Sequence, residues 1–571
     1  MKEPSTVNAT LLAWVRRVAE HTSPDRIHWW TGSPSERSQL IREMRGEGQL
    51  VELDHPNWYL FRTEPSDADP LAETRLSTSN AVTCGPTSKW MSLEQAHTEV
   101  WPLFRNAMRG RTMFVVPYLL GLPHSTFCQV GVEITDSPYI VLCLGLIARI
   151  GRGALDRLGS SKAFLRGLHS SREVAPDQRQ VVHFSETSEI WSIGSGNAHN
   201  ALFPWGRHAL RLASVKAREE GWLAERMTLL RVTDADAQAH HIAVVGSLDT
   251  EALTSSSSVL PGWEVERLGG PTCWLRAGED GRLWAASPDH GSCLAFGPTA
   301  AALLHGEDTS QEMLFTNVAL REGGHPWWPG FEELKAGEVV VDWRGASWLA
   351  GTSAGPAAHP NGLVMTGAGS AFQARPRGVP VTAIVFCGNR PRSTPLVYEA
   401  RSWRHGVYAG ATLTSGTDAL GQPQFDPMGM RDFCGYNLGD YLGHWLSVGR
   451  KLAKPPSLFH VNLQRRAPDG QPLWPGGAAN LFLLKWIVER AEGTAGARSS
   501  GVGLVPSDDE LIVPDILSLD DRIHALSCNP SALLVEAEKA LDFLNRFRQR
   551  LPPALLTEHN RQVRHLQHSL H

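Results

Sequence analysis

The sequence contains few cysteines, no long hydrophobic run and little net charge. Its eight cysteines are spread over 571 residues, and none belongs to a C-x-x-C pair. This spacing argues against a disulfide scaffold and predicts reduced thiols in a cytoplasmic protein. Because no segment reaches about 18 consecutive apolar residues, we expect neither a transmembrane helix nor a membrane partner. The formal net charge of -5 gives no reason to expect a nucleic-acid partner.

The composition is that of a globular protein. Hydrophobic residues make up 42% of the chain and charged residues 20%, a balance that excludes intrinsic disorder and collagen-like repeats. Tryptophan is abundant, with 20 Trp against 7 Tyr, and we expect many of these indoles to anchor hydrophobic cores. A chain of this length has room for several structural units.

Helical and strand-like patterns alternate along the first 220 residues. Apolar spacing predicts helices over Met1–His21 and Met91–Met108, and a strand over Gln129–Thr135. The dipeptide His240-His241 is interpreted as an exposed loop. Frequent Gly, Pro and Asn residues between positions 262 and 400 favour curved mixed sheets over a doubly wound parallel sheet.

Eight sequence blocks occur in one order along the chain and carry a family resemblance. They are Gly110–Pro117, Glu133–Tyr139, Arg218–Glu225, Phe315–Ala319, Ala358–Asn361, Pro395–Ala400, Gly435–Asn437 and Phe459–Asn462. On these blocks the chain resembles the GTP-dependent phosphoenolpyruvate carboxykinases over most of its length.

The resemblance implies an α/β fold with two lobes and an active site in the cleft between them. The N-terminal lobe is expected over residues 1–232, and a C-terminal nucleotide-binding lobe with mixed sheets and a helical end over residues 233–571. The resemblance also implies the family's chemistry, the interconversion of oxaloacetate and phosphoenolpyruvate with GTP, manganese in the site and magnesium on the nucleotide. Because a fold does not determine its chemistry, each functional position is compared separately.

The phosphate loop departs from the family's pattern. The resemblance places this loop on Val244–Ala252, where Thr250 and Glu251 replace the family's Lys and Thr. Losing a cation and gaining a carboxylate beside a triphosphate changes two Coulomb energies by up to about 4 kcal/mol each. The sequence therefore predicts a C-terminal lobe without a functional phosphate loop and a much lower affinity for GTP.

The positions that the resemblance assigns to the metal and to guanine have also changed. Arg226 replaces the metal-binding His, and Gly270 and Pro271 replace two carboxylates. Trp205-Gly206 replaces a Lys-Lys pair that includes the third ligand. Since these side chains offer a divalent cation neither oxygen nor imidazole, we expect no metal site. The guanine clamp maps to three residues without aromatic rings, Gln464, Pro472 and Gly477.

Seven residues at or near former substrate and metal positions are candidate site residues. We interpret Arg226 as a catalytic anion-binding group, because a guanidinium stays charged and binds carboxylate or phosphate through two hydrogen bonds. His199 is the second catalytic candidate, since imidazole transfers protons near neutral pH. The alternatives are an ion pair of Arg226 with Glu225 or another acid, and a structural turn role for His199. The substrate-binding candidates are Asn197, Arg207, Asn361, Asn389 and Arg75.

Two functional hypotheses follow from these substitutions. The preferred one is a repurposed enzyme without GTP, metal or other cofactor, acting as a lyase or decarboxylase on a small carboxylate or phosphonate of specialised metabolism. The second is a non-catalytic pseudoenzyme that binds a metabolite or a protein partner. Both exclude a working GTP-dependent carboxykinase, and we expect a cytoplasmic monomer.

Overall fold

The structure is a computed structural model in which contacts divide the chain into two compact units. Unit 1 comprises Met1–Ala81, Lys89–Leu212 and Pro288–Pro376, and unit 2 comprises Val82–Ser88, Ala213–Ser287 and Arg377–His571. The structure describes residues 6–63, 73–194, 207–246, 260–296, 304, 311–350, 352, 362–366, 376–388, 393–417, 422–467, 469–511 and 518–570.

Unit 1 is built on a mixed sheet of nine strands. Eight of them follow the order β1-β6-β7-β9-β11-β10-β4-β5, and β8 also pairs with β6. The central strands β6 (Thr112–Leu120) and β7 (Gln129–Thr135) are antiparallel and almost entirely buried. The prediction of a strand over residues 129–135 is confirmed. The other strands are β1 (Arg26–Trp29), β4 (Glu73–Ser77), β5 (Trp90–Met91), β8 (Arg149–Ile150), β9 (Leu165–Ser170), β10 (Gln180–Phe184) and β11 (Glu189–Ile193).

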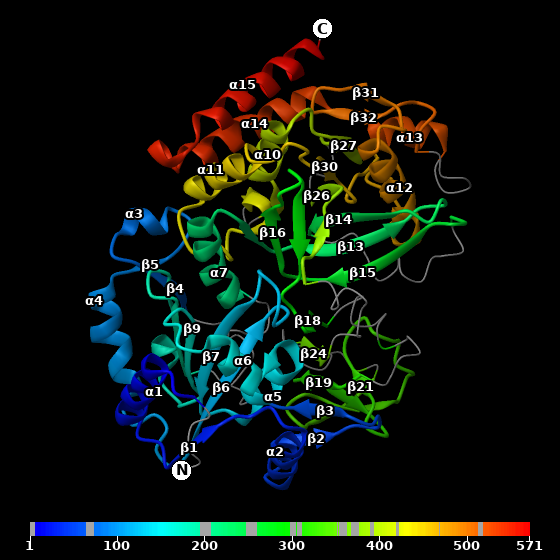
Figure 1. The fold of residues 1–571 in the computed structure, drawn as a ribbon. Helices are drawn as coiled ribbons and strands as arrows, with labels where there is room; N and C mark the ends of the chain where they lie inside the picture. The colour runs from blue at the N-terminus through cyan, green and yellow to red at the C-terminus, as the bar shows by residue number, and fades with distance from the viewer. Residues whose placement is uncertain are drawn as a thin grey trace. The chain divides into compact units, whose positions relative to one another are not determined.

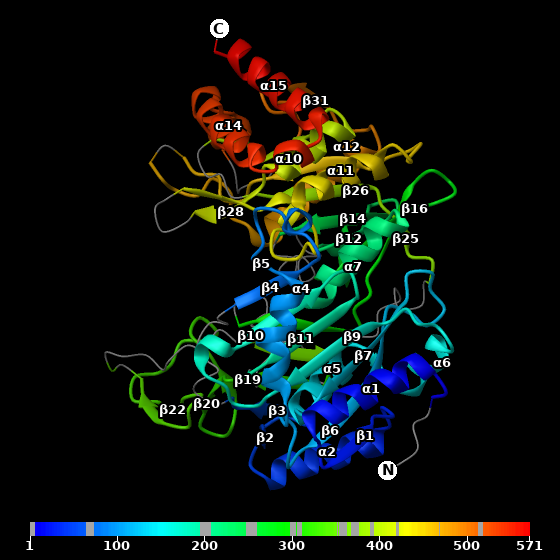
Figure 2. The ribbon, with the colours of Figure 1, turned by 90° about the vertical axis from the view of Figure 1, so that its left-hand side faces the viewer.

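Helices cover both faces of this sheet (Figure 2). Helix α1 (Ala9–Thr22) places Trp14 in one core with Val115 of β6. Helix α5 (Pro138–Ile147), apolar all round, forms a second core with Val116. Because successive side chains of a strand point to opposite faces, the neighbouring residues Val115 and Val116 of β6 pack into different cores. The remaining helical segments of unit 1 are α4 (Leu93–Gln95), η2 (Ala96–Val100), η3 (Trp101–Phe104), α6 (Arg152–Leu158) and η4 (Pro176–Gln178), and α7 (Arg207–Glu220) continues from unit 1 into unit 2.

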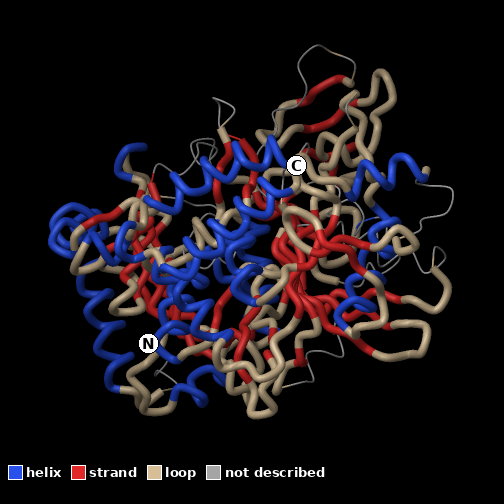
Figure 3. The backbone as a smooth tube through the Cα atoms, turned by 90° about the horizontal axis from the view of Figure 1, so that it is seen from above, coloured by secondary structure: helices blue, strands red, loops and turns tan. Residues whose placement is uncertain are grey.

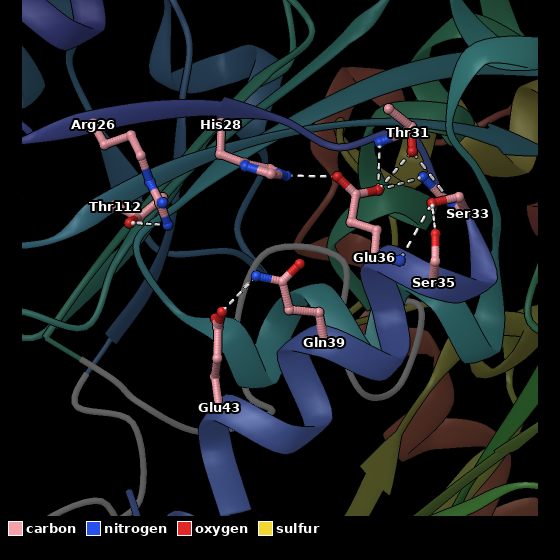
Figure 4. Close-up of polar contacts among 10 residues, drawn as sticks. Arg26, His28, Thr31, Ser33, Ser35, Glu36, Gln39, Glu43 and Thr112 are labelled. Carbon is pink, nitrogen blue, oxygen red and sulfur yellow. Dashed lines mark hydrogen bonds and ion pairs between the residues drawn. The ribbon is translucent and has the colours of Figure 1, made fainter. Parts of the chain in front are cut away.

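A polar network ties the start of α2 (Pro34–Gly46) to β1 (Figure 4). One carboxylate oxygen of Glu36 lies 2.5 Å from Nε2 of His28, and the other accepts hydrogen bonds from the backbone and hydroxyl of Thr31 at 2.9 and 2.7 Å. Burial alone would raise the pKa of Glu36, but the hydrogen bonds from Thr31 and His28 outweigh it and lower that pKa. The Ser33 hydroxyl accepts from the Glu36 amide as the N-terminal cap.

Two smaller sheets complete unit 1. Their orders are β18-β24-β19-β3-β2 and β21-β20-β22-β23. Trp58, Trp327 and Trp328 pack together in the core that they share, so part of the abundant tryptophan is structural, as expected. The strands are β2 (Leu50–Glu52), β3 (Trp58–Phe61), β18 (Gly291–Ala295), β19 (Met313–Thr316), β20 (Ala319–Arg321), β21 (Pro326–Trp327), β22 (Val339–Val341), β23 (Ser347–Leu349) and β24 (Gly362–Thr366).

Unit 2 is built on an eight-stranded mixed sheet, β15-β13-β14-β26-β30-β27-β32-β31 (Figure 1). Its three central strands β14 (Ala239–Val245), β26 (Ala383–Cys387) and β30 (Ser457–Val461) are parallel. A parallel arrangement brings the carboxyl ends of all three strands to the same edge of the sheet. The other strands are β13 (Thr228–Thr233), β15 (Glu264–Gly269), β27 (Val397–Glu399), β31 (Ala497–Ser499) and β32 (Leu504–Pro506).

Helices pack on both faces of the central sheet of unit 2. Helix α12 (Asn480–Ala491) shares a core with Val244 and Val385. On the opposite face, Phe386 packs against Trp445 of α11 (Leu438–Gly449) with ring centroids 6.3 Å apart. The other helical segments are α3 (Ala81–Cys84), α10 (Trp403–Ala411), η6 (Pro427–Gly429), η7 (Gly477–Ala479), α13 (Leu519–Leu526), α14 (Pro530–Asn545), η8 (Arg548–Arg550) and α15 (Pro553–His568).

A second sheet of unit 2, β12-β16-β17-β25, and the hairpin β28-β29 complete the fold. The described chain contains both helices and strands (Figure 3), and the predicted α/β class with mixed sheets is confirmed. None of the described helices has the length and hydrophobicity needed to cross a bilayer. The strands are β12 (Leu223–Glu225), β16 (Cys273–Ala277), β17 (Leu283–Ala286), β25 (Val379–Pro380), β28 (Thr414–Thr417) and β29 (Pro423–Phe425).

Candidate functional site

A pocket of about 610 Å³ lies at the carboxyl ends of the three parallel strands of unit 2. Strand β14 ends at Val245 and is followed by Gly246, β26 ends at Cys387 and is followed by Gly388, and Gln464 comes shortly after the end of β30. All five residues line the pocket. Ligands of open α/β sheets bind at this edge, because loops diverge there and leave a crevice. The pocket is therefore the candidate functional site of unit 2.

Glycine is required at Gly246, where β14 turns into the pocket. Its φ of +86° is in the left-handed region, which glycine adopts without a steric penalty. A Cβ atom at this position would lie 2.9 Å from the Cβ of Cys387. The first turn after β14 thus passes close to the end of β26, and both strands contribute backbone to the pocket.

Arg226 is one of two cations that line the pocket among its described residues. It follows β12 directly, and its amide donates a hydrogen bond to Sδ of Met430 at 3.3 Å. Its guanidinium lies 5.0 Å from the centroid of the Phe433 ring, a cation–π contact that restricts where the charge sits. Arg226 is thus a lining residue of the pocket, and the catalytic role expected for it stays a prediction.

Glu225, the neighbour of Arg226, is completely buried. Its carboxyl accepts hydrogen bonds from the Tyr441 hydroxyl at 2.5 Å and from Nε1 of Trp445 at 3.1 Å. Burial raises the pKa of Glu225 to about 8, although these two hydrogen bonds act in the opposite direction. The Glu225 carboxyl thus engages α11. The catalytic role of Arg226 stays a prediction, as does its alternative, an ion pair with an acid.

Asp426 is the one carboxylate among the described residues that line the pocket. Its Oδ1 accepts a hydrogen bond from the Arg431 amide at 2.9 Å. Burial raises the pKa of Asp426, and the charges of Arg431 and Arg226 partly oppose that shift. The described lining thus contains two arginines, Arg226 and Arg466, and one carboxylate, a balance of charge that favours an anionic ligand.

The described residues do not fit a divalent cation. Among them, no group of three or more His, Cys, Asp or Glu side chains is placed to hold a metal ion. Arg226 occupies the position that the resemblance assigns to the metal-binding His. Gly270 and Pro271, in the turn between β15 and β16, bring no carboxylate. Hard cations need several oxygen ligands, so we derive no chemical step through a metal.

Two of the seven predicted site residues have described side chains. Arg226 lines the pocket of unit 2, whereas Arg75 belongs to unit 1, on β4 in register with Val182 of β10. Arg207 begins α7, and only its backbone is described. Arg75 and Arg226 thus belong to different units. Four predicted residues lie outside the described residues: Asn197, His199, Asn361 and Asn389.

Several residues that line the pocket were not predicted from the sequence. Arg466 and Trp474 lie on the turn between β30 and α12, and Thr414 and Ser415 lie on β28. Arg466 donates from Nη1 to the Gly470 carbonyl at 2.8 Å, and Trp474 donates from Nε1 to Asn480 Oδ1 at 2.7 Å. The sequence did point to this segment, because the resemblance assigns its residues Gln464 and Pro472 to guanine binding.

Comparison with known proteins assigns the whole chain to one family. Residues 13–218 match the phosphoenolpyruvate carboxykinase N-terminal domain, and residues 222–565 match the phosphoenolpyruvate carboxykinase C-terminal P-loop domain. A phosphoenolpyruvate carboxykinase [GTP] of Anaeromyxobacter dehalogenans is 38% identical over 558 residues, covering 94% of this chain and 93% of that relative. Proteins of the same name from Corynebacterium jeikeium and Chlamydia trachomatis are each 36% identical, with at least 95% of both chains covered.

These relatives correct five expectations. The repurposed lyase of specialised metabolism and the pseudoenzyme are both wrong as leading hypotheses, because proteins 36–38% identical over nearly their full length are named carboxykinases. The exclusion of carboxykinase activity, the exclusion of GTP and the loss of the phosphate loop are wrong on the same finding, since residues 222–565 match a P-loop domain. The physical reason is that these expectations were based on the loss of single side chains. The fold still forms a pocket at the strand ends, and its lining includes Arg226 and Arg466. Matches to both domain models and this identity show that the chain belongs to the family of GTP-type phosphoenolpyruvate carboxykinases.

Proposed function

We propose that the chain is a GTP-dependent phosphoenolpyruvate carboxykinase and that GTP binds in the pocket of unit 2. The observation that carries this proposal is the position of the pocket. It lies at the carboxyl ends of β14, β26 and β30 and is lined by Gly246, Gln464 and Pro472. These residues belong to the segments that the resemblance assigns to the phosphates and to guanine. A location at the ends of parallel strands is typical of nucleotide sites.

The finer proposal is that the site is a divergent version of the family's site. The loop residues Thr250 and Glu251 would bind a triphosphate less well than Lys and Thr, because they remove a cation and add a carboxylate. Gly270 and Pro271 would leave the metal position without its carboxylates. In place of three aromatic clamp residues, Trp474 offers a ring in the lining of the pocket. We expect weaker GTP binding than in a member with the full set of family residues.

Phosphoryl transfer depends on positioning and on neutralising the phosphate charge. In this pocket the guanidinium groups of Arg226 and Arg466 would supply positive charge, and the hydroxyls of Thr414 and Ser415 would supply hydrogen bonds. Gly246 would let the backbone approach the phosphates closely. The candidate substrate contacts of Arg75, Asn197, His199, Arg207, Asn361 and Asn389 remain proposals, as does a cytoplasmic location.

The test is a steady-state assay of the purified full-length chain. Oxaloacetate, GTP and manganese are supplied, and formation of phosphoenolpyruvate is followed by a coupled enzyme or by NMR. The proposal predicts product formation that requires both oxaloacetate and GTP and that falls in Arg226→Gln. Arg498→Gln, a partly exposed arginine on β31 that lies outside the pocket lining, is the matched control and should keep full activity. Absence of product at saturating GTP would overturn the proposal.

A further inference from the structure

A separate recess of about 460 Å³, which we call the α14 pocket, lies where the segment after β30 meets the turn between α13 and α14. Its described lining contains Arg465, Arg466 and His524 and neither Asp nor Glu. We propose that the α14 pocket binds a phosphate group, free or carried by a small metabolite, and that the Arg465 guanidinium is the main anchor. The inference does not depend on the proposed function.

The Arg465 guanidinium is buried, yet only part of it is hydrogen-bonded. The residue is 6% exposed. Its Nη2 donates to the carbonyl of His524 at 3.1 Å and to the carbonyl and hydroxyl of Ser527, each at 3.3 Å. Nε and Nη1 have no hydrogen-bond partner among the described residues. Because a guanidinium presents five N–H donors in a fixed fork, donors of Arg465 stay available to a further acceptor.

The charge of Arg465 is also left uncompensated. Its partners are carbonyl and hydroxyl oxygens, so no carboxylate pairs with it in the part of the chain that the structure describes. Burial lowers the pKa of Arg465, and Cys528 acts in the opposite direction. A buried charge without a counter-charge is unfavourable. An oxyanion beside Arg465 would remove that cost, and phosphate accepts two parallel hydrogen bonds from one guanidinium.

The surroundings of Arg465 favour an anion. Helix α14 is 16 residues long, and its N-terminal cap Asn529 lines the pocket. The N-terminal end of a helix has a partial positive charge. His524 adds positive charge when it is protonated. The Asp520 carboxylate lies 3.7 Å from Nδ1 of His524 and reduces that contribution.

The backbone holds Arg465 in place before any ligand arrives. Its amide donates to the Asn462 carbonyl at 3.2 Å, and its carbonyl accepts from the Leu473 amide at 2.9 Å. The hydrogen bonds of Nη2 attach its side chain to the turn before α14. A group that is fixed before binding loses little conformational freedom in the complex.

Cys528 offers a local test of binding. It is a partly exposed free cysteine in the lining of the α14 pocket, so a bound phosphate should shield it from iodoacetamide. The full chain is treated in potassium phosphate or in potassium chloride of equal ionic strength, and mass spectrometry follows the modification of each cysteine. We expect phosphate to slow the reaction of Cys528 in a saturable way. Cys128, a partly exposed cysteine of unit 1, should react at an unchanged rate.

Two variants test the role of Arg465. In Arg465→Gln, the phosphate concentration that gives half-maximal protection should rise by about tenfold or more, the effect of losing a hydrogen bond to a charged group. Arg465→Lys keeps the charge in case Arg465→Gln does not fold, and it should also raise that concentration, because lysine lacks the planar fork. Thermal melting checks the fold of both. Arg498→Gln, whose arginine lies outside the lining of the α14 pocket, should behave like the unaltered chain.

The choice of anion identifies the ligand. Stronger protection by glycerol phosphate than by inorganic phosphate would assign the pocket to a phosphorylated metabolite, and the reverse order would assign it to the free ion. An unchanged rate for Cys528 at about 10 mM of either anion, well above a millimolar dissociation constant, would overturn the inference. Equal protection by acetate would overturn the assignment to phosphate, and full protection in the folded Arg465 variants would overturn the role of Arg465.

Discussion

The hydroxyl of Tyr441 donates a 2.5 Å hydrogen bond to the buried carboxyl of Glu225, one residue from the guanidinium that lines the pocket of unit 2. This contact connects α11 to the end of β12, two elements far apart in the sequence. The contact therefore anchors the residue next to Arg226 to the buried helix α11.

Tyr441→Phe should destabilise the protein. The substitution removes one of two donors to Glu225 and leaves a buried oxygen unsatisfied, at a cost of about 1–3 kcal/mol. Urea unfolding followed by circular dichroism measures the change. Tyr436→Phe is the comparison, because the Tyr436 hydroxyl makes a longer contact of 3.3 Å with His444. If both variants lose the same unfolding free energy, the hydrogen bond to Glu225 contributes no more to stability than the contact between Tyr436 and His444.

Acidification should cost stability through Glu36. Its pKa is lowered in the folded protein, so its hydrogen bonds to Thr31 and His28 contribute stability at pH values above the ordinary carboxyl pKa. That contribution is lost as the pH falls through the lowered pKa. Glu36→Gln should therefore unfold more easily than the unaltered chain at neutral pH, with a difference that shrinks toward low pH. A constant difference at every pH would contradict the assignment.

Glu133 should have the opposite pH dependence. It is 1% exposed, and neither of its oxygens has a hydrogen-bond partner among the described residues. Burial raises its pKa to about 8, so the folded state retains a proton that the unfolded state releases near its ordinary pKa. Stability should thus decrease as the pH rises from that ordinary value to about 8.

Glu133→Met tests this assignment by removing the buried carboxyl at similar size. We expect a gain of about 1–3 kcal/mol at neutral pH and a flatter dependence of unfolding free energy on pH. Chemical unfolding at pH 5, 7 and 9 measures both effects. A variant that is less stable than the unaltered chain at all three values would show that an unseen partner satisfies Glu133.

The local sequence predicts well the elements that neighbouring residues determine. The strand over residues 129–135 was predicted to the residue. The helix expected over residues 91–108 is instead divided into α4, η2 and η3. Pro102 lies in the last of these segments, and a proline lacks the amide that a continuous helix requires.

Elements that depend on the sheet were harder to predict. His240 and His241, expected in an exposed loop, lie buried on β14, and Nε2 of His240 is 2.9 Å from a carboxylate oxygen of Asp234. Arg466 and Trp474 were missed as pocket residues for a related reason. The segment that contains them lines the same pocket as the end of β14 because β14 and β30 both pair with β26 in one sheet. Local sequence does not specify this order of strands. The lobe boundary at residue 232 stays a prediction.

Restoring the family's residues in the phosphate loop should strengthen GTP binding. Thr250→Lys combined with Glu251→Thr adds a cation and removes a carboxylate at positions that lie outside the described residues. We expect the dissociation constant for GTP to fall by about tenfold or more, since each charge change acts directly on the triphosphate. Calorimetry measures the effect, and each single variant should give part of it. Unchanged affinity would show that this segment does not contact the phosphates.

The most direct measurement is a crystal structure of the chain grown with GTP. We predict nucleotide density in the pocket at the ends of β14, β26 and β30, with phosphate oxygens at about 2.7–2.9 Å from the Arg226 guanidinium. Density for GTP at another place, or phosphates in the pocket that make no contact with Arg226, would contradict the account.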